Sequence, residues 1–148
     1  MKKIILLIMC CTVFLAACGG DSNTAPNVDL SKCISDFESN MVLAPDYSYV
    51  KDYNIEVKNK DISITIVVSD GTSNSDALEF ADTVLRQLNL YASQQDGSVA
   101  LGNSDGYGGL YDYYSASVGV AHSSNTGNSS KWIIQDGITS SKDKLKTK

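Results

Sequence analysis

Side chains able to act as nucleophiles or general bases are few in this 148-residue chain. His122 is the only histidine, so any serine or cysteine nucleophile activated by imidazole has to use it. It ends a predicted strand, directly before a serine-rich turn. Cys33 falls on the apolar stripe of a predicted helix, where cysteines are usually inert packing residues. We therefore expect no catalytic role for either residue, and carboxylate pairs assembled by the fold stay open as a hydrolytic alternative.

Calcium gives the best match among the metal hypotheses, and its pattern is incomplete. Residues 103–106 (NSDG), followed by Asp112, resemble the middle of an EF-hand loop. The first loop position falls on Leu101, which offers no oxygen ligand, and the twelfth falls on Asp112 where a bidentate glutamate is needed. The sequence also lacks a His and Cys cluster at zinc-ligand spacing. We therefore expect no metal site and no cofactor.

The most distinctive candidate for a binding surface in this sequence is a cluster of aromatic residues. Three tyrosines cluster in and after a glycine-rich loop at 94–109, interleaved with two aspartates. On an open sheet face, such rings would stack on sugars or anchor a protein partner, because they bury much area at small entropy cost. As ordinary strand residues they would instead be half-buried by their neighbours. The candidate partner-binding set is Tyr107, Tyr111, Tyr113, Asp105, Asp112 and Trp132.

Two amphipathic helices are predicted from apolar residues at helical spacing. The first follows a possible N-cap at Asp29 and ends at residues 44–46 (APD). The second starts near the capping-box pattern of Asp76 and Glu79 and continues to about Ala92. Their apolar stripes are Leu30, Cys33, Ile34, Phe37 and Met41 in the first helix, and Ala77, Ala81, Val84, Leu85, Leu88 and Tyr91 in the second.

Alternating apolar and polar residues predict four strands. A two-residue loop at 59–60 pairs Lys58 with Asp61 and Tyr53 with Ile66, so that apolar residues face apolar partners along a hairpin. Residues 110–122 and 131–138 alternate in the same way, on either side of a turn at 123–130. The expected fold is α+β, an antiparallel four-stranded sheet with helices on one face, in the order αββαββ.

The first eighteen residues have the shape of an export signal. Met1, Lys2 and Lys3 precede an uncharged apolar run at 4–14, which is too short to cross a bilayer. The run closes with Leu15, Ala16, Ala17 and Cys18. This segment resembles the lipobox of bacterial lipoproteins. The resemblance implies cleavage before Cys18 and attachment of acyl chains to its thiol, whereas an ordinary cleaved signal would leave Cys18 incidental.

The charge of the chain changes once the signal is removed. The whole sequence carries −5, with a pI of about 4.6, which disfavours a dedicated nucleic-acid binder because phosphates require a basic face. Residues 18–138 hold 16 acidic and 6 basic side chains, whereas 140–148 hold four lysines and one aspartate. The expected organisation is a signal peptide at 1–17, a lipidated flexible tether at 18–28, a domain at 29–139 and a basic disordered tail at 140–148.

Together these features predict a lipid-anchored, non-enzymatic binding module of the bacterial cell envelope. The open sheet face and the 97–109 loop would make the contact, and the partners would be the membrane through Cys18 and an envelope protein or cell-wall glycan. In a Gram-negative host, the resemblance to bacterial lipoproteins, with Gly19 after the cysteine, implies the outer membrane, on its periplasmic or surface side. The alternative is an inhibitor or immunity-type lipoprotein whose acidic body caps a basic active site. An envelope hydrolase is the third class.

The lipobox makes anchoring depend on one thiol. Cys18→Ser is expected to abolish incorporation of radioactive palmitate and full partition with membranes, because the acyl chains supply the anchoring free energy. Metabolic labelling and membrane fractionation measure both. Cys33→Ser leaves the lipobox intact and should keep both properties. A Cys18→Ser protein that still labels with palmitate contradicts lipidation at this residue.

Overall fold

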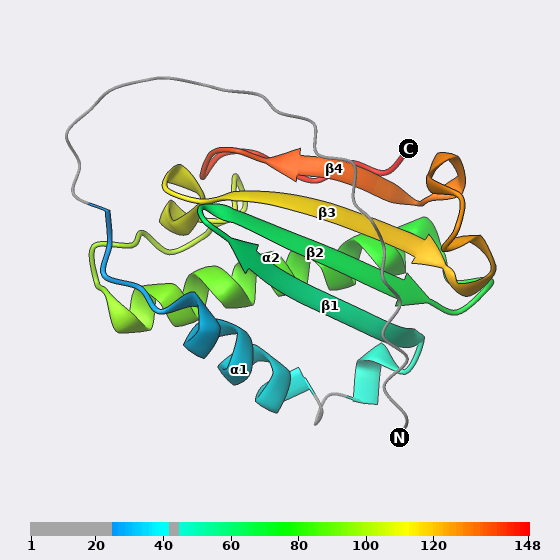
Figure 1. Cartoon of the computed structure of the whole chain (residues 1–148), viewed down its shortest axis with the longest axis horizontal. Helices are drawn as coiled ribbons and strands as arrows, with labels where there is room; N and C mark the ends of the chain where they lie inside the picture. Colours follow the sequence, from blue (N-terminus) through cyan, green and yellow to red (C-terminus); the bar gives the residue numbers. More distant parts are fainter. Residues whose placement is uncertain (1–24, 42–44) are drawn as a thin grey trace.

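The computed structural model describes residues 25–41 and 45–148, so the predicted signal peptide and Cys18 lie outside the described residues. Within these ranges the chain forms an α+β fold with two helices and a four-stranded sheet (Figure 1). The elements are α1 (Leu30–Met41), β1 (Val50–Lys58), β2 (Asp61–Val68), α2 (Asn74–Gln95), β3 (Ser115–His122) and β4 (Ile134–Ile138), with the short 3-10 turns η1 (Pro45–Tyr47), η2 (Gly109–Asp112), η3 (Ser123–Asn125) and η4 (Ser129–Lys131) between them.

Side-chain caps set the starts of both helices. Asp29 accepts hydrogen bonds from the backbone N–H groups of Ser31 and Lys32, at 3.0 and 3.2 Å, which confirms it as the N-cap of α1. The Ser73 hydroxyl caps α2 by accepting from the Asp76 N–H at 3.1 Å. The second helix therefore starts before the expected Asp76 and ends at Gln95, three residues beyond the expected end. None of the described helices is both long enough and apolar enough to span a bilayer.

The first hairpin has the predicted register. Lys58 pairs with Asp61, and Tyr53 pairs with Ile66. Asn59 takes the left-handed φ of 59° that the turn requires, and it is the only non-glycine residue with a positive φ in the described part of the chain. Lys60, which occupies the usual place of glycine, is therefore free of backbone strain of this kind.

The expectation of a wholly antiparallel sheet is wrong. β2 and β3 pair in parallel, from Asp61 opposite Ser115 to Val68 opposite His122, whereas the β1–β2 and β3–β4 pairs are antiparallel. The strand order is β1-β2-β3-β4. The reason is the length of α2, whose 22 residues rise about 33 Å and return the chain to the end of the sheet where β2 begins. A strand that starts there beside β2 has to run parallel to it.

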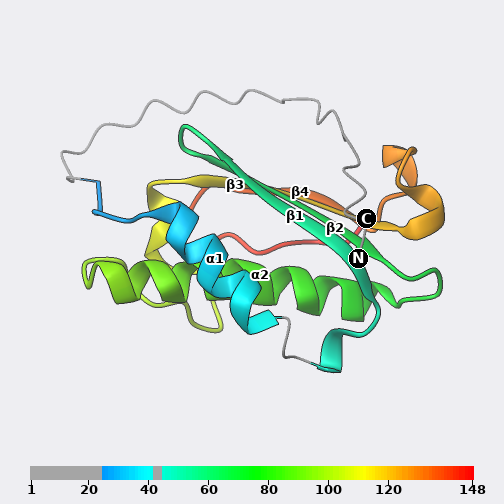
Figure 2. The same ribbon diagram turned by 60° about the horizontal axis from the view of Figure 1, so that its bottom comes forward.

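The hydrophobic core lies between one face of the sheet and the two helices, which confirms helices on one face (Figure 2). The inward side chains of β2 are almost completely buried, as are the sheet-facing side chains of α2. The β1 edge is less well covered, since Val57 is 39% exposed. The strand contribution to the core is Ile62, Ile64, Ile66, Val68, Ala116, Val118, Val120, Ile134 and Ile138.

Both predicted flexible ends pack on the domain. Pro26 is buried, and the Asn27 N–H donates to the Asp96 carboxylate at 2.8 Å, so ordered chain begins inside the expected tether at 18–28. At the other end, Leu145 is buried, and the Lys148 N–H donates to the Ile133 carbonyl at 2.9 Å. The expected disordered tail at 140–148 is therefore wrong, because Leu145 provides an apolar contact that holds the segment along β4.

Candidate functional site

The loop between α2 and β3 is built around a buried amide. Asn89 is 1% exposed, and its side chain donates to the Ala100 carbonyl at 3.1 Å and accepts from the Leu110 N–H at 3.0 Å. Gly108 has a φ of 109°, and a Cβ there would lie 2.2 Å from the Asn89 amide nitrogen. Only glycine allows this approach. The loop is thus packed onto α2 by specific bonds.

Tyr107 and Tyr111 are each only 1% exposed, so they cannot form the expected contact shelf. The Tyr107 hydroxyl donates to the Asp82 carboxylate and accepts from the Leu145 N–H at 3.1 Å. The Arg86 guanidinium lies 5.2 Å from the centre of the Tyr107 ring. Burial, and then the bond to Asp82, raises the pKa of the Tyr107 hydroxyl. These contacts join the loop, α2 and the C-terminal segment.

Tyr111 turns inward because its segment is a 3-10 turn rather than the start of a strand. The expected strand at 110–122 begins only at Ser115, so the predicted alternation of Tyr111 and Tyr113 does not apply. The Tyr111 hydroxyl donates to the Leu85 carbonyl at 2.8 Å, and burial raises its pKa well above the usual value. Its ring meets the Tyr107 ring edge-on, with 6.1 Å between centres. Both tyrosines are therefore parts of the core.

The remaining members of the candidate set do not come together. Asp105 and Asp112 are exposed and Tyr113 is half-buried. Asp112 accepts from the Ser141 N–H at 2.8 Å and so fixes the C-terminal turn. Trp132 is 8% exposed, and its ring lies against Gly119, where a Cβ would be 2.5 Å from the nearest ring carbon. The structure thus separates Trp132 from Tyr107 and Tyr111.

The calcium-like segment at 103–106 is occupied by protein contacts. The Asn103 side chain accepts from the Asp105 N–H at 2.7 Å and closes its own turn. The Arg86 guanidinium donates to the carbonyls of Asn103 and Gly106, at 2.8 and 3.3 Å. The positive guanidinium of Arg86 is therefore held beside the carbonyl oxygens of this segment. Within residues 25–41 and 45–148, no three His, Cys, Asp or Glu side chains are grouped so as to hold a metal ion.

The contacts of His122 and Cys33 are those of residues that hold the fold together. The His122 Nε2 lies 3.0 Å from the Thr72 carbonyl, while the neighbouring Ser123 hydroxyl donates to Asp70 at 3.1 Å. A backbone bond from Ser124 is the main cause that lowers the pKa of Asp70. Cys33 is fully buried, and Gln95 donates to its sulfur at 3.2 Å. Serine, histidine and aspartate are thus neighbours here, but the serine bonds the aspartate and the histidine bonds the backbone.

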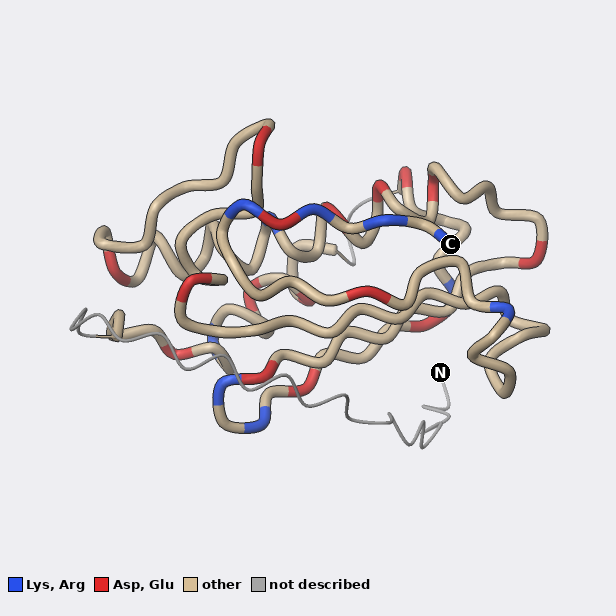
Figure 3. Tube along the Cα trace, turned by 90° about the horizontal axis from the view of Figure 1, so that it is seen from above, with Lys and Arg blue, Asp and Glu red and all other residues tan. Residues whose placement is uncertain are grey.

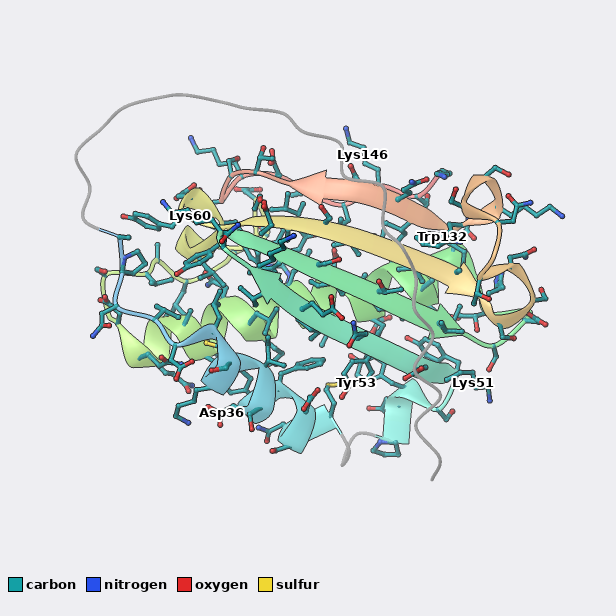
Figure 4. The ribbon with its side chains drawn as sticks, in the orientation of Figure 1. Asp36, Lys51, Tyr53, Lys60, Trp132 and Lys146 are labelled. Carbon is teal, nitrogen blue, oxygen red and sulfur yellow. The ribbon has the colours of Figure 1, made fainter. Side chains whose placement is uncertain are left out.

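The open face of the sheet is the remaining candidate surface, and we define it by the outward side chains of the four strands. In the view of Figure 1, α2 passes behind this face, and Figure 2 shows both described helices on the same side of the sheet. Its central positions Ser63, Thr65 and Ser117 are small and at least partly exposed, whereas the Trp132 ring covers Gly119 on β3 (Figure 4). The Trp132 Nε1 is buried and has no hydrogen-bond partner among the described residues. The members with strand pairing are Asp52, Asn54, Glu56, Lys58, Asp61, Ser63, Thr65, Val67, Ser115, Ser117, Gly119, Ala121, Gln135 and Gly137.

Comparison with known proteins adds no family to this description. No protein-family model, curated protein or solved structure matches the chain. The functional inference therefore depends on the surfaces and contacts of the described residues, together with the predicted lipobox at Cys18.

Asn89→Ala is expected to destabilise the fold by at least about 2 kcal/mol, because it leaves the buried Leu110 N–H without its acceptor and removes the bond to Ala100. Urea unfolding followed by circular dichroism measures the loss. Asn54→Ala, at an exposed position on β1, is the control and should change the unfolding free energy by less than about 0.5 kcal/mol. Equal effects of the two substitutions would contradict the role of Asn89.

The Cys33 thiol should react with Ellman's reagent at neutral pH only after unfolding, because burial raises its pKa from 9.0 to about 11. A raised folded pKa favours the neutral thiol, so its contribution to stability is complete below pH 9 and is lost as the pH rises toward 11. The unfolding free energy should therefore fall more steeply over this range in the native chain than in Cys33→Ala. With Cys10, Cys11 and Cys18 replaced by serine, rapid labelling of the folded protein would refute the burial of Cys33.

Proposed function

We propose that this protein is an exported, lipid-anchored binding module of the bacterial cell envelope, without enzymatic activity, and that it binds a partner protein through the open face of its sheet. The observation that carries the proposal is the one-sided helix layer. Both described helices cover the same face, which leaves the opposite face of a four-stranded sheet available for contact (Figure 2). The buried positions of Tyr107 and Tyr111 move the proposed contact from the loop to this face.

The charge of the open face favours a partner with a basic surface. At its paired positions, Asp52, Glu56 and Asp61 outnumber the cation of Lys58, while Lys51 and Lys60 lie at the bulge of β1 and in the hairpin turn. The described residues up to 138 carry 15 acidic and 6 basic side chains, which extends the same sign over the domain. Such a field accelerates encounter with a cationic protein and selects against anionic ones.

A protein partner fits this face better than a cell-wall glycan does. Sugar rings stack on the exposed faces of aromatic side chains. Trp132 is the aromatic residue on this side of the sheet, and at 8% exposure its ring offers little area for stacking. The exposed central position Ser117 is small instead and suits close approach of a polypeptide surface, whereas Gly119 is covered by the Trp132 ring.

The same acidic charge supports a second candidate, an inhibitor or immunity-type lipoprotein. In that case the partner would be an enzyme, and the open face would cover its basic active site. The two candidates share the contact surface and the salt dependence. They differ in whether the partner loses activity when it is bound, which an activity measurement on the crosslinked partner decides.

A photo-crosslinking amino acid at Ser117 or Asn54, both exposed on the open face, is expected to give one discrete protein adduct in intact cells. The same amino acid at Ser39 of α1 or Gln94 of α2, exposed on the helical side, should give none. Asp52→Asn with Glu56→Gln should reduce the adduct at Ser117 at least about tenfold, because it removes two attractive charges.

The matched control for charge is Glu38→Gln with Asp46→Asn, which neutralises two exposed carboxylates away from the sheet and should leave the adduct unchanged. Adducts confined to Ser39 and Gln94 would overturn the proposed surface. An adduct at Ser117 that persists in high salt and in the neutralised variant would refute the basic partner.

A further inference from the structure

The C-terminal segment forms a second charged surface, distinct from the open face. Residues 140–148 carry four lysines and one aspartate. After β4 the chain turns, with Asp143 accepting from the N–H groups of Thr139 and Ser140 at 2.7 and 2.9 Å. It then runs back beside β4, where the Lys146 N–H donates to Asp136 at 2.9 Å. The segment is therefore fixed to the sheet edge rather than free in solution.

Leu145 gives the segment a defined orientation. Its side chain is buried, and its N–H donates to the Tyr107 hydroxyl at 3.1 Å. In extended chain, successive side chains point to opposite sides, so Lys144 and Lys146 point away from the domain. Figure 4 shows Lys146 beyond the β4 edge and directed outward, and Figure 3 shows the basic positions in a row that leads to the C-terminus. We call Lys142, Lys144 and Lys146 the lysine row.

The side chains of the lysine row have no protein partner among the described residues. The ion pair between Lys32 and Asp36 is the only one within 4.0 Å in this part of the chain. The Lys148 ammonium differs, since it donates to the Ser129 carbonyl and to Gln135, at 2.9 and 2.7 Å. Lys148 thus fastens the end of the segment, whereas the lysine row presents three exposed cations to solvent.

Nearby carboxylates are engaged on the domain side of the segment. Asp112, Asp136 and Asp143 each accept a hydrogen bond from a backbone N–H of residues that follow β4. Their oxygens are therefore directed toward the backbone, and the ammonium groups of the lysine row form the outer layer. The sign of this edge is therefore opposite to the net charge of the described residues up to 138.

We propose that the lysine row binds the anionic headgroups of phospholipids and so fixes how the domain stands on the membrane. Charge complementarity is the basis, because anionic lipid surfaces attract lysine side chains that reach them together. A row along one sheet edge lets several cations meet one plane, which a scattered distribution does not. The presence of a membrane beside the domain depends on the proposed lipid anchor, but the affinity of the lysine row for anionic lipid does not.

Contact through this edge leaves the open face accessible. The lysine row lies beyond β4, whereas the acidic side chains of the open face are on β1 and β2 (Figures 3 and 4). A domain attached by its β4 edge therefore turns the open face sideways, with its acidic side away from the anionic surface. Attachment and partner binding thus use different parts of the sheet.

The test is sedimentation of the full chain carrying Cys18→Ser with phosphatidylcholine vesicles, with and without phosphatidylglycerol. The chain is expected to bind the anionic vesicles more tightly and to lose this preference at high salt. Each lysine near an anionic surface contributes about fivefold in affinity. Replacement of the lysine row by glutamine should therefore weaken binding to phosphatidylglycerol between about tenfold and a hundredfold.

The matched control replaces Lys51, Lys58 and Lys60 by glutamine, which makes the same change in net charge on exposed residues of β1 and its hairpin. It should change binding less than about twofold. The apolar segment at 4–14 is common to all variants, so it does not affect their comparison. Equal losses in the two variants, or no preference of the starting chain for phosphatidylglycerol, would overturn the proposal.

A second measurement distinguishes the membrane contact of the lysine row from the contribution of the proposed lipid anchor. A fluorophore on a cysteine introduced at Thr147, which is exposed beside the lysine row, should shift to shorter wavelength on anionic vesicles. Cys10 and Cys11 are replaced by serine, so that the introduced cysteine takes the label. The same label at Ser117 on the open face should not. A shift at Ser117 alone would refute the orientation. If Cys18 is not labelled with palmitate, the proposed lipid anchor is refuted, but the affinity of the lysine row for anionic vesicles still stands.

Discussion

The parallel pairing of β2 with β3 is the constraint on which the other features of this fold depend. Because the two strands run in the same direction, the chain has to return along the sheet between them, and α2 makes this return on one face. The loop from Asp96 to Tyr114 then has to lead from the end of α2 back to the start of β3. Asn89, Tyr107 and Tyr111 hold that loop against α2, so the residues with the most binding-like composition are used for packing.

The local periodicity of the sequence predicted the hairpin register and the two helices, because these depend on residues that are close together in the chain. The β1–β2 register follows from the alternation around 59–60, since a shift by one residue would place Ile62 and Ile64 on the wrong face. Both helices follow from their apolar stripes. The parallel pair could not be found in this way, because the alternation at 115–122 is the same whichever direction the strand runs beside β2.

The candidate site was predicted less well, because burial depends on contacts between distant parts of the chain. The pattern of Tyr111 and Tyr113 suggested a strand face, but η2 is a 3-10 turn and places Tyr111 in the core. The C-terminal lysines suggested a solvated tail, and the single apolar Leu145 among them was too weak a signal of docking. The periodicity of α2 places Asn89 with the polar side chains of the helix, so the buried amide that fixes the following loop could not be predicted.

The C-terminal segment also protects the sheet from other chains. A strand at the edge of a sheet presents unpaired N–H and C=O groups, which invite strand pairing between molecules. Just before β4, the Lys148 N–H takes up the Ile133 carbonyl, while the bond from the Lys146 N–H to the Asp136 side chain holds the segment beside the strand. Deletion of residues 140–148 would therefore free the Ile133 carbonyl and uncover the apolar surface beneath Leu145, and would favour aggregation in concentrated solution.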